Sequence, residues 1–355
     1  MSKKRIHKFI LYAALFIAIM GLTFWNVFRG QDFEGMMHAV GEMSGWYVIA
    51  AVILAVSFVS GEGIMIWYLL KGIGEGKSLF RCLSYSFTGF FFSGITPSAS
   101  GGQPMQLYYM KRDGCTFSSS FAVLMIIAVL NKLAMALLGV GILLFWGGQL
   151  QTRLQGYYGL FCVGLLIHIC WVIILFLIMF CSEGIKKILY RLEKIPVRLK
   201  LWKESAARRE KIESFFAGYK ETVDFLQGHK KMIAAIVAGS FLQRGCLLVL
   251  ACAVYRGLGL QGTALSNIFL LQAAVSVAVE MLPIPGAQGI TEAMYGSVFG
   301  GIFPGHFLVA SICITRGISF YFVLAVGGLW VLLRAFTERK KGGGNTEGYN
   351  AEETE

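Results

Sequence analysis

Six ionisable residues interrupt the long apolar runs of this sequence, where a membrane helix rarely carries charge. They are Glu62, Lys132, Arg244, Glu280, Glu292 and Arg316. Arginine and lysine bind phosphate or carboxylate groups, and glutamate binds ammonium groups. The set therefore predicts a buried polar path for a charged ligand. The alternative is a set of internal ion pairs that hold helices together, and Glu62 fits either role.

No enzyme motif accompanies these charges. The sequence contains no GxSxG, no Walker loop and no GxGxxG between a strand and a helix. Its eight cysteines show no CxxC spacing and its five histidines are scattered. We therefore expect no catalytic residue, no metal, no cofactor and no ATP-driven transport by this chain alone. A membrane transferase would have only Glu62, Glu280 and Glu292 as acid or base candidates.

The composition is that of a polytopic membrane protein. Of 355 residues, 56% are hydrophobic and 15% are charged. A membrane-spanning helix needs about 20 apolar residues. Long apolar runs lie at 9–28, 46–70, 117–146, 158–181, 233–255 and 306–334, and shorter, interrupted ones lie at 79–110 and 265–303. We predict an all-α fold with about six full spans.

The distribution of lysine and arginine predicts the orientation in the membrane. Basic residues cluster at the start of the chain, in the segment 182–232, which holds thirteen of them, and after the last run. Placing these three regions on the cytoplasmic side puts both termini there. The net charge of +12 is then a membrane-flanking signal, and we expect no nucleic-acid partner.

We predict one membrane domain over residues 1–341, with halves at about 1–150 and 151–341. The segment 182–232 alternates basic with apolar residues, which fits interfacial helices on an anionic leaflet or a solvated helical connector. The tail 342–355 is Gly-rich and then acidic, so we predict that it is disordered.

Two proline- and glycine-rich breaks interrupt the shorter apolar runs. If the first run crossed the membrane once, the segment with thirteen basic residues would lie outside. We therefore predict a re-entrant hairpin that enters from the cytoplasm and breaks at Thr96–Pro104. The second break, Pro283–Gly289, has no basic residue, so we predict a hairpin that enters from outside. Irregular backbone at this depth survives only when buried in protein or lining a wet cavity. The alternative is a broken helix without a ligand role.

The order of spans and hairpins repeats with opposite orientation, which predicts an inverted repeat of the transporter type. A helix that restarts after each break would turn free N–H groups toward an anion. Simple turn chemistry is the alternative. The candidate tip residues are Pro97, Ser98, Ser100, Gly101, Gly102, Gln103, Pro104, Pro283, Pro285, Gly286, Gln288 and Gly289.

Four stretches carry a resemblance to a known family. They are "TPSASGGQPMQLYYMKRDG" (96–114), "LNKL" (130–133), "LPIPGAQGITEA" (282–293) and the arginine of "ITRGISFYF" (314–322). Together they resemble the lysylphosphatidylglycerol synthase membrane region, a flippase-like group also called uncharacterised membrane family 0104. The chain departs from the pattern at Ala287, where the family has a second glycine, and at Thr291, where arginine is common.

The resemblance implies movement of an aminoacylated or anionic phosphatidylglycerol across a bacterial cell membrane. The chain resembles the membrane domain of multiple peptide resistance factors, in which a separate cytosolic domain makes the lipid. The chain ends about twenty residues after the last apolar run, so we expect that domain to be absent and a separate synthase to be a partner. The alternatives are a phosphatidylglycerol lysyltransferase, as the family label suggests, and a partner protein for envelope assembly.

Overall fold

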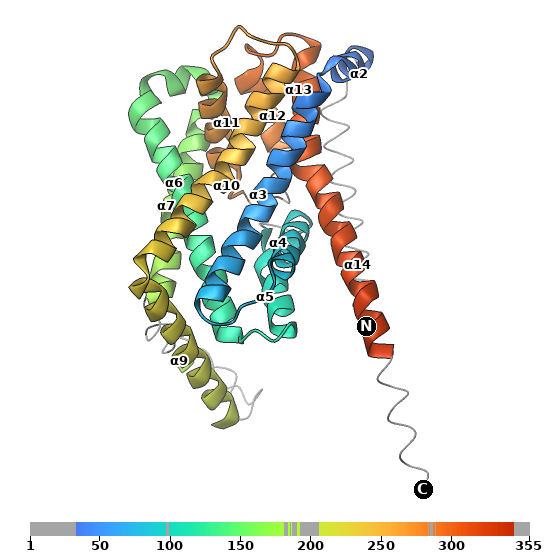
Figure 1. Cartoon of the computed structure of the whole chain (residues 1–355). Helices are drawn as coiled ribbons and strands as arrows, with labels where there is room; N and C mark the ends of the chain where they lie inside the picture. The colour runs from blue at the N-terminus through green and yellow to red at the C-terminus, as the bar shows by residue number, and fades with distance from the viewer. Residues whose placement is uncertain are drawn as a thin grey trace.

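The computed structural model describes residues 33–96, 99–180, 206–282 and 289–343, with the single positions 184, 186, 190, 191, 284 and 287. Every regular element within these residues is a helix, which confirms the all-α prediction for them. The long helices run roughly parallel to one axis and form a bundle (Figure 1). The predicted span 9–28 and residues 344–355 of the tail lie outside the described residues.

The long helices follow the predicted apolar runs. They are α3 (Gly45–Gly72), α6 (Phe117–Leu154), α7 (Tyr158–Phe180) and α10 (Lys230–Gly257), and the short α2 (Phe33–Glu42) precedes them. The last run forms α13 (His306–Arg316), the π-helix η4 (Gly317–Phe322) and α14 (Val323–Gly343). Helix α6 extends eight residues beyond the predicted end at 146, where Leu150 and Leu154 are fully buried, so packing outweighs the low helix propensity of Gly147 and Gly148.

Four stretches are long and apolar enough to cross a membrane: Gly45–Gly72, Phe117–Phe180, Lys230–Gly257 and His306–Arg334. The second comprises both α6 and α7, which the short 3₁₀ helix η2 (Gln155–Tyr157) joins. Gln155 adopts a φ of 50°, and the chain turns back on itself there (Figure 1). The protein is thus a multi-pass membrane protein by helix length and composition.

The two interrupted runs form two pairs of short helices. The first pair is α4 (Leu79–Gly94) and α5 (Gly102–Arg112), and the second is α11 (Leu265–Val279) and α12 (Ile290–Phe299). The pairs lie in opposite halves of the bundle (Figure 1). Helices α5 and α12 have 11 and 10 residues, about half of what a span needs. The interruptions are confirmed, and the re-entrant course stays a prediction.

The basic C-terminal ends of α3 and α5 and the basic start of α10 lie at one end of the bundle, together with α9 (Ala206–Gly228) (Figure 1). The exposed Glu213 of α9 accepts hydrogen bonds from Lys186 and from the Tyr190 hydroxyl, the latter at 2.7 Å. These bonds hold the pKa of Glu213 below its usual range. Helix α9 fits the predicted basic connector, whereas residues 192–205 lie outside the described part of the chain.

At the same end, Arg334 of α14 holds the first hairpin. Its Nη2 donates to both carboxylate oxygens of Asp113, at 2.9 and 2.8 Å, and its Nη1 donates to Ser84 at 3.1 Å. The Tyr85 hydroxyl donates to the same carboxylate at 2.7 Å, and the guanidinium carbon lies 4.2 Å from the Tyr109 ring centroid. The sequence presented Arg334 only as a cytoplasmic marker, but it is a structural contact between α14 and the α4–α5 pair.

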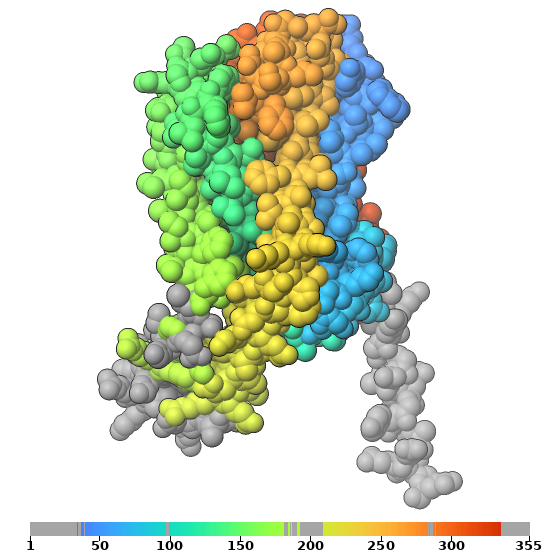
Figure 2. Space-filling model, turned by 60° about the vertical axis from the view of Figure 1, so that its left-hand side comes forward, coloured from blue at the N-terminus to red at the C-terminus, as the bar shows by residue number. Residues whose placement is uncertain are grey.

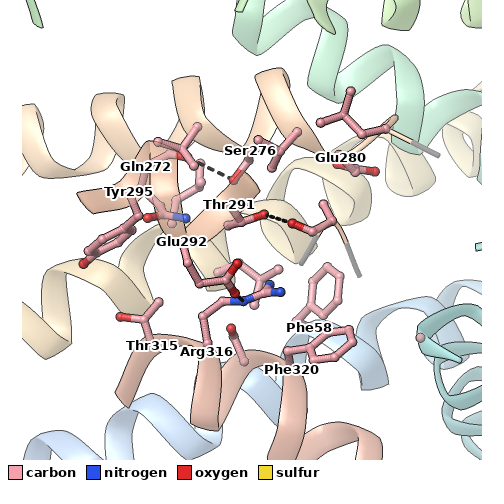
Figure 3. A pocket seen from close by; sticks show the side chains of 18 of the residues that line it. Phe58, Gln272, Ser276, Glu280, Thr291, Glu292, Tyr295, Thr315, Arg316 and Phe320 are labelled. Carbon is pink, nitrogen blue, oxygen red and sulfur yellow. Dashed lines mark hydrogen bonds and ion pairs between the residues drawn. The ribbon is translucent and has the colours of Figure 1, made fainter. Parts of the chain in front are cut away.

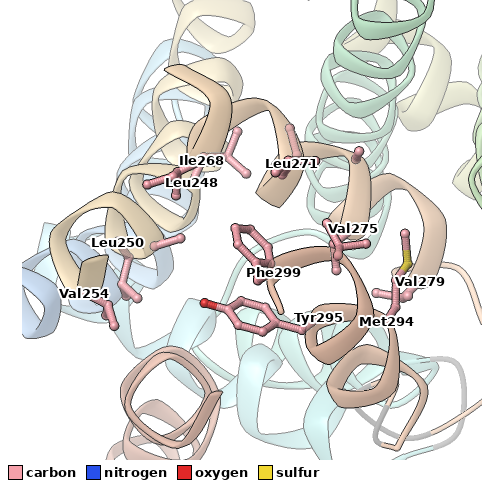
Figure 4. Packing of buried hydrophobic residues seen from close by; sticks show 14 of the residues in the cluster. Leu248, Leu250, Val254, Ile268, Leu271, Val275, Val279, Met294, Tyr295 and Phe299 are labelled. Atoms are coloured by element: carbon pink, nitrogen blue, oxygen red, sulfur yellow. The ribbon is translucent and has the colours of Figure 1, made fainter. Parts of the chain in front are cut away.

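The second hairpin is anchored by aromatic packing. Tyr295 and Phe299 of α12 stack with ring centroids 4.3 Å apart and lie among the buried residues of α10 and α11 (Figure 4). Both side chains are at least 96% buried, with exposed fractions of 4% and 0%. This packing fixes α12 in rotation and therefore fixes where its first turn points.

A close contact between α7 and α11 also positions the second hairpin. A Cβ atom at Gly164 would lie 2.5 Å from the carbonyl oxygen of Val277 and 2.8 Å from the Cα atom of Ala278. Both atoms belong to the backbone and cannot rotate away. Small residues at membrane helix interfaces permit this kind of approach.

We expect Gly164→Ala to lower the midpoint of thermal unfolding of the purified protein in detergent, because α7 and α11 must separate. The control is Gly245→Ala in α10, where an added Cβ meets nothing within 4 Å. Alanine favours helix over glycine, so the control should be neutral or slightly stabilising. Equal midpoints for the two variants would contradict the proposed contact.

Candidate functional site

One cavity lies where the two hairpins meet. Its volume is about 360 Å³, and residues of α3, α4, α10, α11, α12 and α13 line it (Figure 3). Each hairpin contributes residues next to its break: Ser93, Gly94 and Ala99 from the first, and Ile284, Ala287 and Thr291 from the second. The tertiary structure thus brings together two breaks that are almost 190 residues apart in the sequence.

Two alanines at these breaks adopt left-handed backbone conformations. Ala99 has a φ of 54° and Ala287 has a φ of 49°, and both line the cavity. This conformation costs a residue other than glycine roughly 1–2 kcal/mol. Ala287 stands at the position where the sequence pattern has glycine, and its φ supplies the reason. Strain of this kind collects at functional sites, which makes the cavity wall a candidate site.

The first ion pair of the cavity connects α12 to α13. Arg316 Nε donates to Glu292 Oε1 at 2.7 Å, with the two side chains 17% and 5% exposed. Glu292 Oε2 accepts from the Gly289 N–H at 2.7 Å, which a φ of 82° at Gly289 permits. The anion that the sequence predicted for this helix N-terminus is therefore supplied by the protein. Arg316 also lies over Phe320, at 4.9 Å from the ring centroid.

The second ion cluster connects three helices. Glu280, which follows α11, accepts from Lys132 of α6 at 2.6 Å and from Arg244 of α10 at 2.9 Å. Arg244 lies 5.8 Å from the centroid of the Phe58 ring. Arg244 lines the cavity, but its Nε is buried away from the cavity and has no hydrogen-bond partner within the described residues.

Glu62 lies apart from the cavity lining. Its carboxylate accepts a hydrogen bond of 2.6 Å from Gln106 Nε2, which joins α3 to α5. Gln106 is 2% exposed and packs against Gly89 of α4, where a Cβ would lie 2.3 Å from Nε2. This geometry corresponds to the structural role that the sequence left open for Glu62.

The predicted charges are thus arranged around the cavity in three ways. Arg244, Glu280, Glu292 and Arg316 line it, Lys132 reaches it through Glu280, and Glu62 does not line it. The internal ion pairs that the sequence offered as an alternative are present. They also form part of the cavity wall, so pairing and ligand contact do not exclude each other here.

The predicted tip residues that the structure describes are not part of the cavity lining. Helix α5 begins at Gly102, so Gln103 and Pro104 belong to its first turn, and both are exposed, as is Ser100. Gly102 is buried where a Cβ would lie 2.7 Å from the carbonyl oxygen of Gly89, and the Gly101 N–H donates to Thr96 at 2.9 Å. The other predicted tip residues lie outside the described residues: Pro97, Ser98, Pro283, Pro285, Gly286 and Gln288.

The sequence analysis missed several polar residues of the site. Gln272 and Ser276 line the cavity with Glu280, and their spacing of four residues places all three on one helix face (Figure 3). That spacing was a usable signal. No such spacing in the sequence pointed to His168 of α7. This side chain is fully buried, and its ring nitrogens have no hydrogen-bond partner in the described part of the chain. Glu280 lies close enough to interact with it electrostatically.

The helices and the cavity define a multi-pass membrane protein with an interior cavity whose largely apolar wall carries paired charges. Residues 10–327 match the family described as the lysylphosphatidylglycerol synthase TM region, and the chain belongs to that family. A UPF0104 membrane protein of Methanothermobacter thermautotrophicus is 24% identical over 295 residues, which cover 73% of this chain and 77% of that relative. The resemblance inferred from the four sequence stretches is confirmed.

The two ion clusters predict different costs for the loss of an arginine. Arg316→Met leaves the buried Glu292 carboxylate with the Gly289 N–H alone, among the partners described above. Breaking a buried pair in this way typically costs about 3–5 kcal/mol. Arg244→Met leaves Glu280 paired with Lys132, so we expect a smaller loss.

Thermal unfolding in detergent measures the difference. The double variant Arg316→Met/Glu292→Gln should recover much of the midpoint lost in Arg316→Met, because no unpaired charge remains. Equal midpoints for Arg316→Met and Arg244→Met, or no recovery in the double variant, would contradict the two-cluster description.

Proposed function

We propose that this protein translocates a phospholipid between the leaflets of a bacterial cell membrane, with an anionic or aminoacylated phosphatidylglycerol headgroup as substrate. The observation that supports this most is the cavity at the meeting point of both hairpin breaks, with arginines and glutamates in its wall. Family membership supports the link to this lipid class. No catalytic step is part of the proposal.

The cavity chemistry suits a headgroup with a phosphate. The guanidinium groups of Arg244 and Arg316 supply positive charge for a phosphate, and Glu280 or Glu292 supplies an acceptor for an ammonium group. Apolar side chains, among them Phe58, Phe90 and Phe320, line the rest of the cavity and are compatible with the glycerol and the first methylenes of the acyl chains.

The ion pairs explain how such a site can lie within a membrane. An unpaired charge at this depth is costly, so Arg316 pairs with Glu292, and Arg244 and Lys132 both pair with Glu280. A headgroup that carries both signs can replace each internal partner without leaving a bare charge. We propose that the two hairpins enter from opposite sides of the membrane, so that movement of either one exposes the cavity to one leaflet.

Liposomes that contain the purified protein test the proposal. A fluorescent phosphatidylglycerol and its lysyl ester are each followed from the inner to the outer leaflet. We expect movement with the wild type and loss of most of it in Ser276→Trp, because the indole fills the cavity and leaves both ion pairs in place. Val249→Trp in the same membrane region is the control, since Val249 is 44% exposed and does not line the cavity.

The outcome also separates the alternatives. A lysyltransferase would change the total amount of the lysyl lipid, whereas a translocase changes only its distribution between leaflets. An envelope-assembly partner would leave the distribution unchanged in all samples. Equal movement in wild type and Ser276→Trp, from equally stable samples, would refute the cavity as the lipid path.

A further inference from the structure

A second, apolar groove lies on the outside of the bundle and shares no residue with the central cavity. Its volume is about 520 Å³, and four helices form it: α6, α7, α9 and α10. Each helix contributes apolar residues to its lining. They include Val129 of α6, Phe176 and Phe180 of α7, Leu226 of α9 and Ile233 of α10. In Figure 2 the surfaces of α7 (green) and α10 (yellow) both belong to this face, with α9 below.

The groove is apolar except at the end that α9 and α10 share. There, only Gln227 and Lys230 contribute polar side chains to its lining. Lys230 is exposed and takes part in no ion pair within the described residues, and the same holds for its neighbour Lys231. A long apolar surface that ends at a free ammonium group is complementary to an amphiphile with an anionic head.

The start of α10 adds to this positive charge. Its first turn contains Lys230 and Lys231 but no acidic residue, and no side chain accepts a hydrogen bond at its N-cap, His229. Cations destabilise a helix at this end because its free N–H groups already carry partial positive charge. The nearest acidic residues of α9, Glu221 and Asp224, are exposed and form no ion pair with either lysine. An anion bound here would offset both the helix dipole and the lysines.

The position of the groove selects the kind of amphiphile. Helix α10 begins a candidate membrane span at Lys230, and α7 ends one at Phe180. The polar end of the groove therefore lies where two membrane helices end, at the depth of the lipid headgroups. Its apolar part extends along α6 toward the hydrocarbon region. Basic pockets between membrane helices of this kind bind anionic lipid headgroups.

We propose that this groove is a binding site for an anionic phospholipid, with one acyl chain between α7 and α10 against α6 and the phosphate on Lys230. The lipid would stay with the protein and hold α9 against the bundle. The site is separate from the translocation path, so it does not depend on the proposed function.

The binding test uses the full-length protein in a neutral detergent, titrated with phosphatidylglycerol or with phosphatidylcholine, and the readout is the midpoint of thermal unfolding against lipid concentration. We expect phosphatidylglycerol to raise the midpoint at lower concentration than phosphatidylcholine does. Ala234→Trp should abolish the difference, because Ala234 is exposed on α10 and lines the groove. Ala235→Trp is the matched control, since Ala235 is equally exposed and does not line it.

Lys230→Gln should weaken phosphatidylglycerol binding about fivefold, in line with the contribution of one lysine at an anionic surface. Lys220→Gln, an exposed residue of α9 outside the groove, should leave binding unchanged. Equal affinity for both lipids, or equal binding by Ala234→Trp and Ala235→Trp, would overturn the proposal. A change of oligomeric state in Ala234→Trp alone, measured by light scattering, would instead assign the groove to contact between copies and would also overturn it.

Discussion

Every polar group at the depth of a broken helix must find a partner inside the protein, because hydrocarbon offers none. The structure meets this requirement with side chains close to each break. Thr96 accepts from the Gly101 N–H beside the first break, and Glu292 accepts from the Gly289 N–H beside the second. The charge that Glu292 brings is then balanced by Arg316 of the next helix. The hydrogen bond at the second break therefore brings in a carboxylate, and that carboxylate requires a basic residue on the next helix, α13.

The same constraint explains how the bundle is assembled around the hairpins. Glu280 connects α6 and α10 to the end of α11, and Glu62 connects α3 to α5. These bonds attach the end of α11 and the helix α5 to long helices. The aromatic packing of α12 and the close approach at Gly164 add van der Waals contacts, which drive helix association in lipid because lipid tails are as apolar as the side chains.

The cavity lies where this requirement is only partly met. The buried Nε of Arg244 has no hydrogen-bond partner within the described residues, and Ala99 and Ala287 adopt left-handed backbone conformations. Around them lie aromatic and aliphatic side chains of several helices. The interior thus combines paired charges, an unfilled hydrogen-bonding position and apolar walls. The outer groove differs from it in kind, because among the described residues its only charged side chain, Lys230, lies at one end and forms no ion pair.

The sequence by itself determined the helices and their interruptions. Apolar runs with a period and length suited to a membrane define α3, α6, α7 and α10, and the prolines and glycines near 97–104 and 283–289 define the two breaks. It also identified six charges inside apolar runs, where charge is costly; Glu292 is buried and the other five are partly buried. Local pattern was sufficient for these features because they depend on residues close together in the chain.

Only the tertiary structure decided which charges meet. Nothing in the sequence connects Lys132 with Glu280, or Arg334 with Asp113, because these pairs join residues 148 and 221 positions apart. The same is true of the cavity, which needs both breaks at one place, and of His168, whose surroundings come from other helices. The physical reason is that the path of the chain between helices sets these distances. Hydropathy indicates how deep in the membrane a residue lies, but it does not indicate which other residue that side chain contacts.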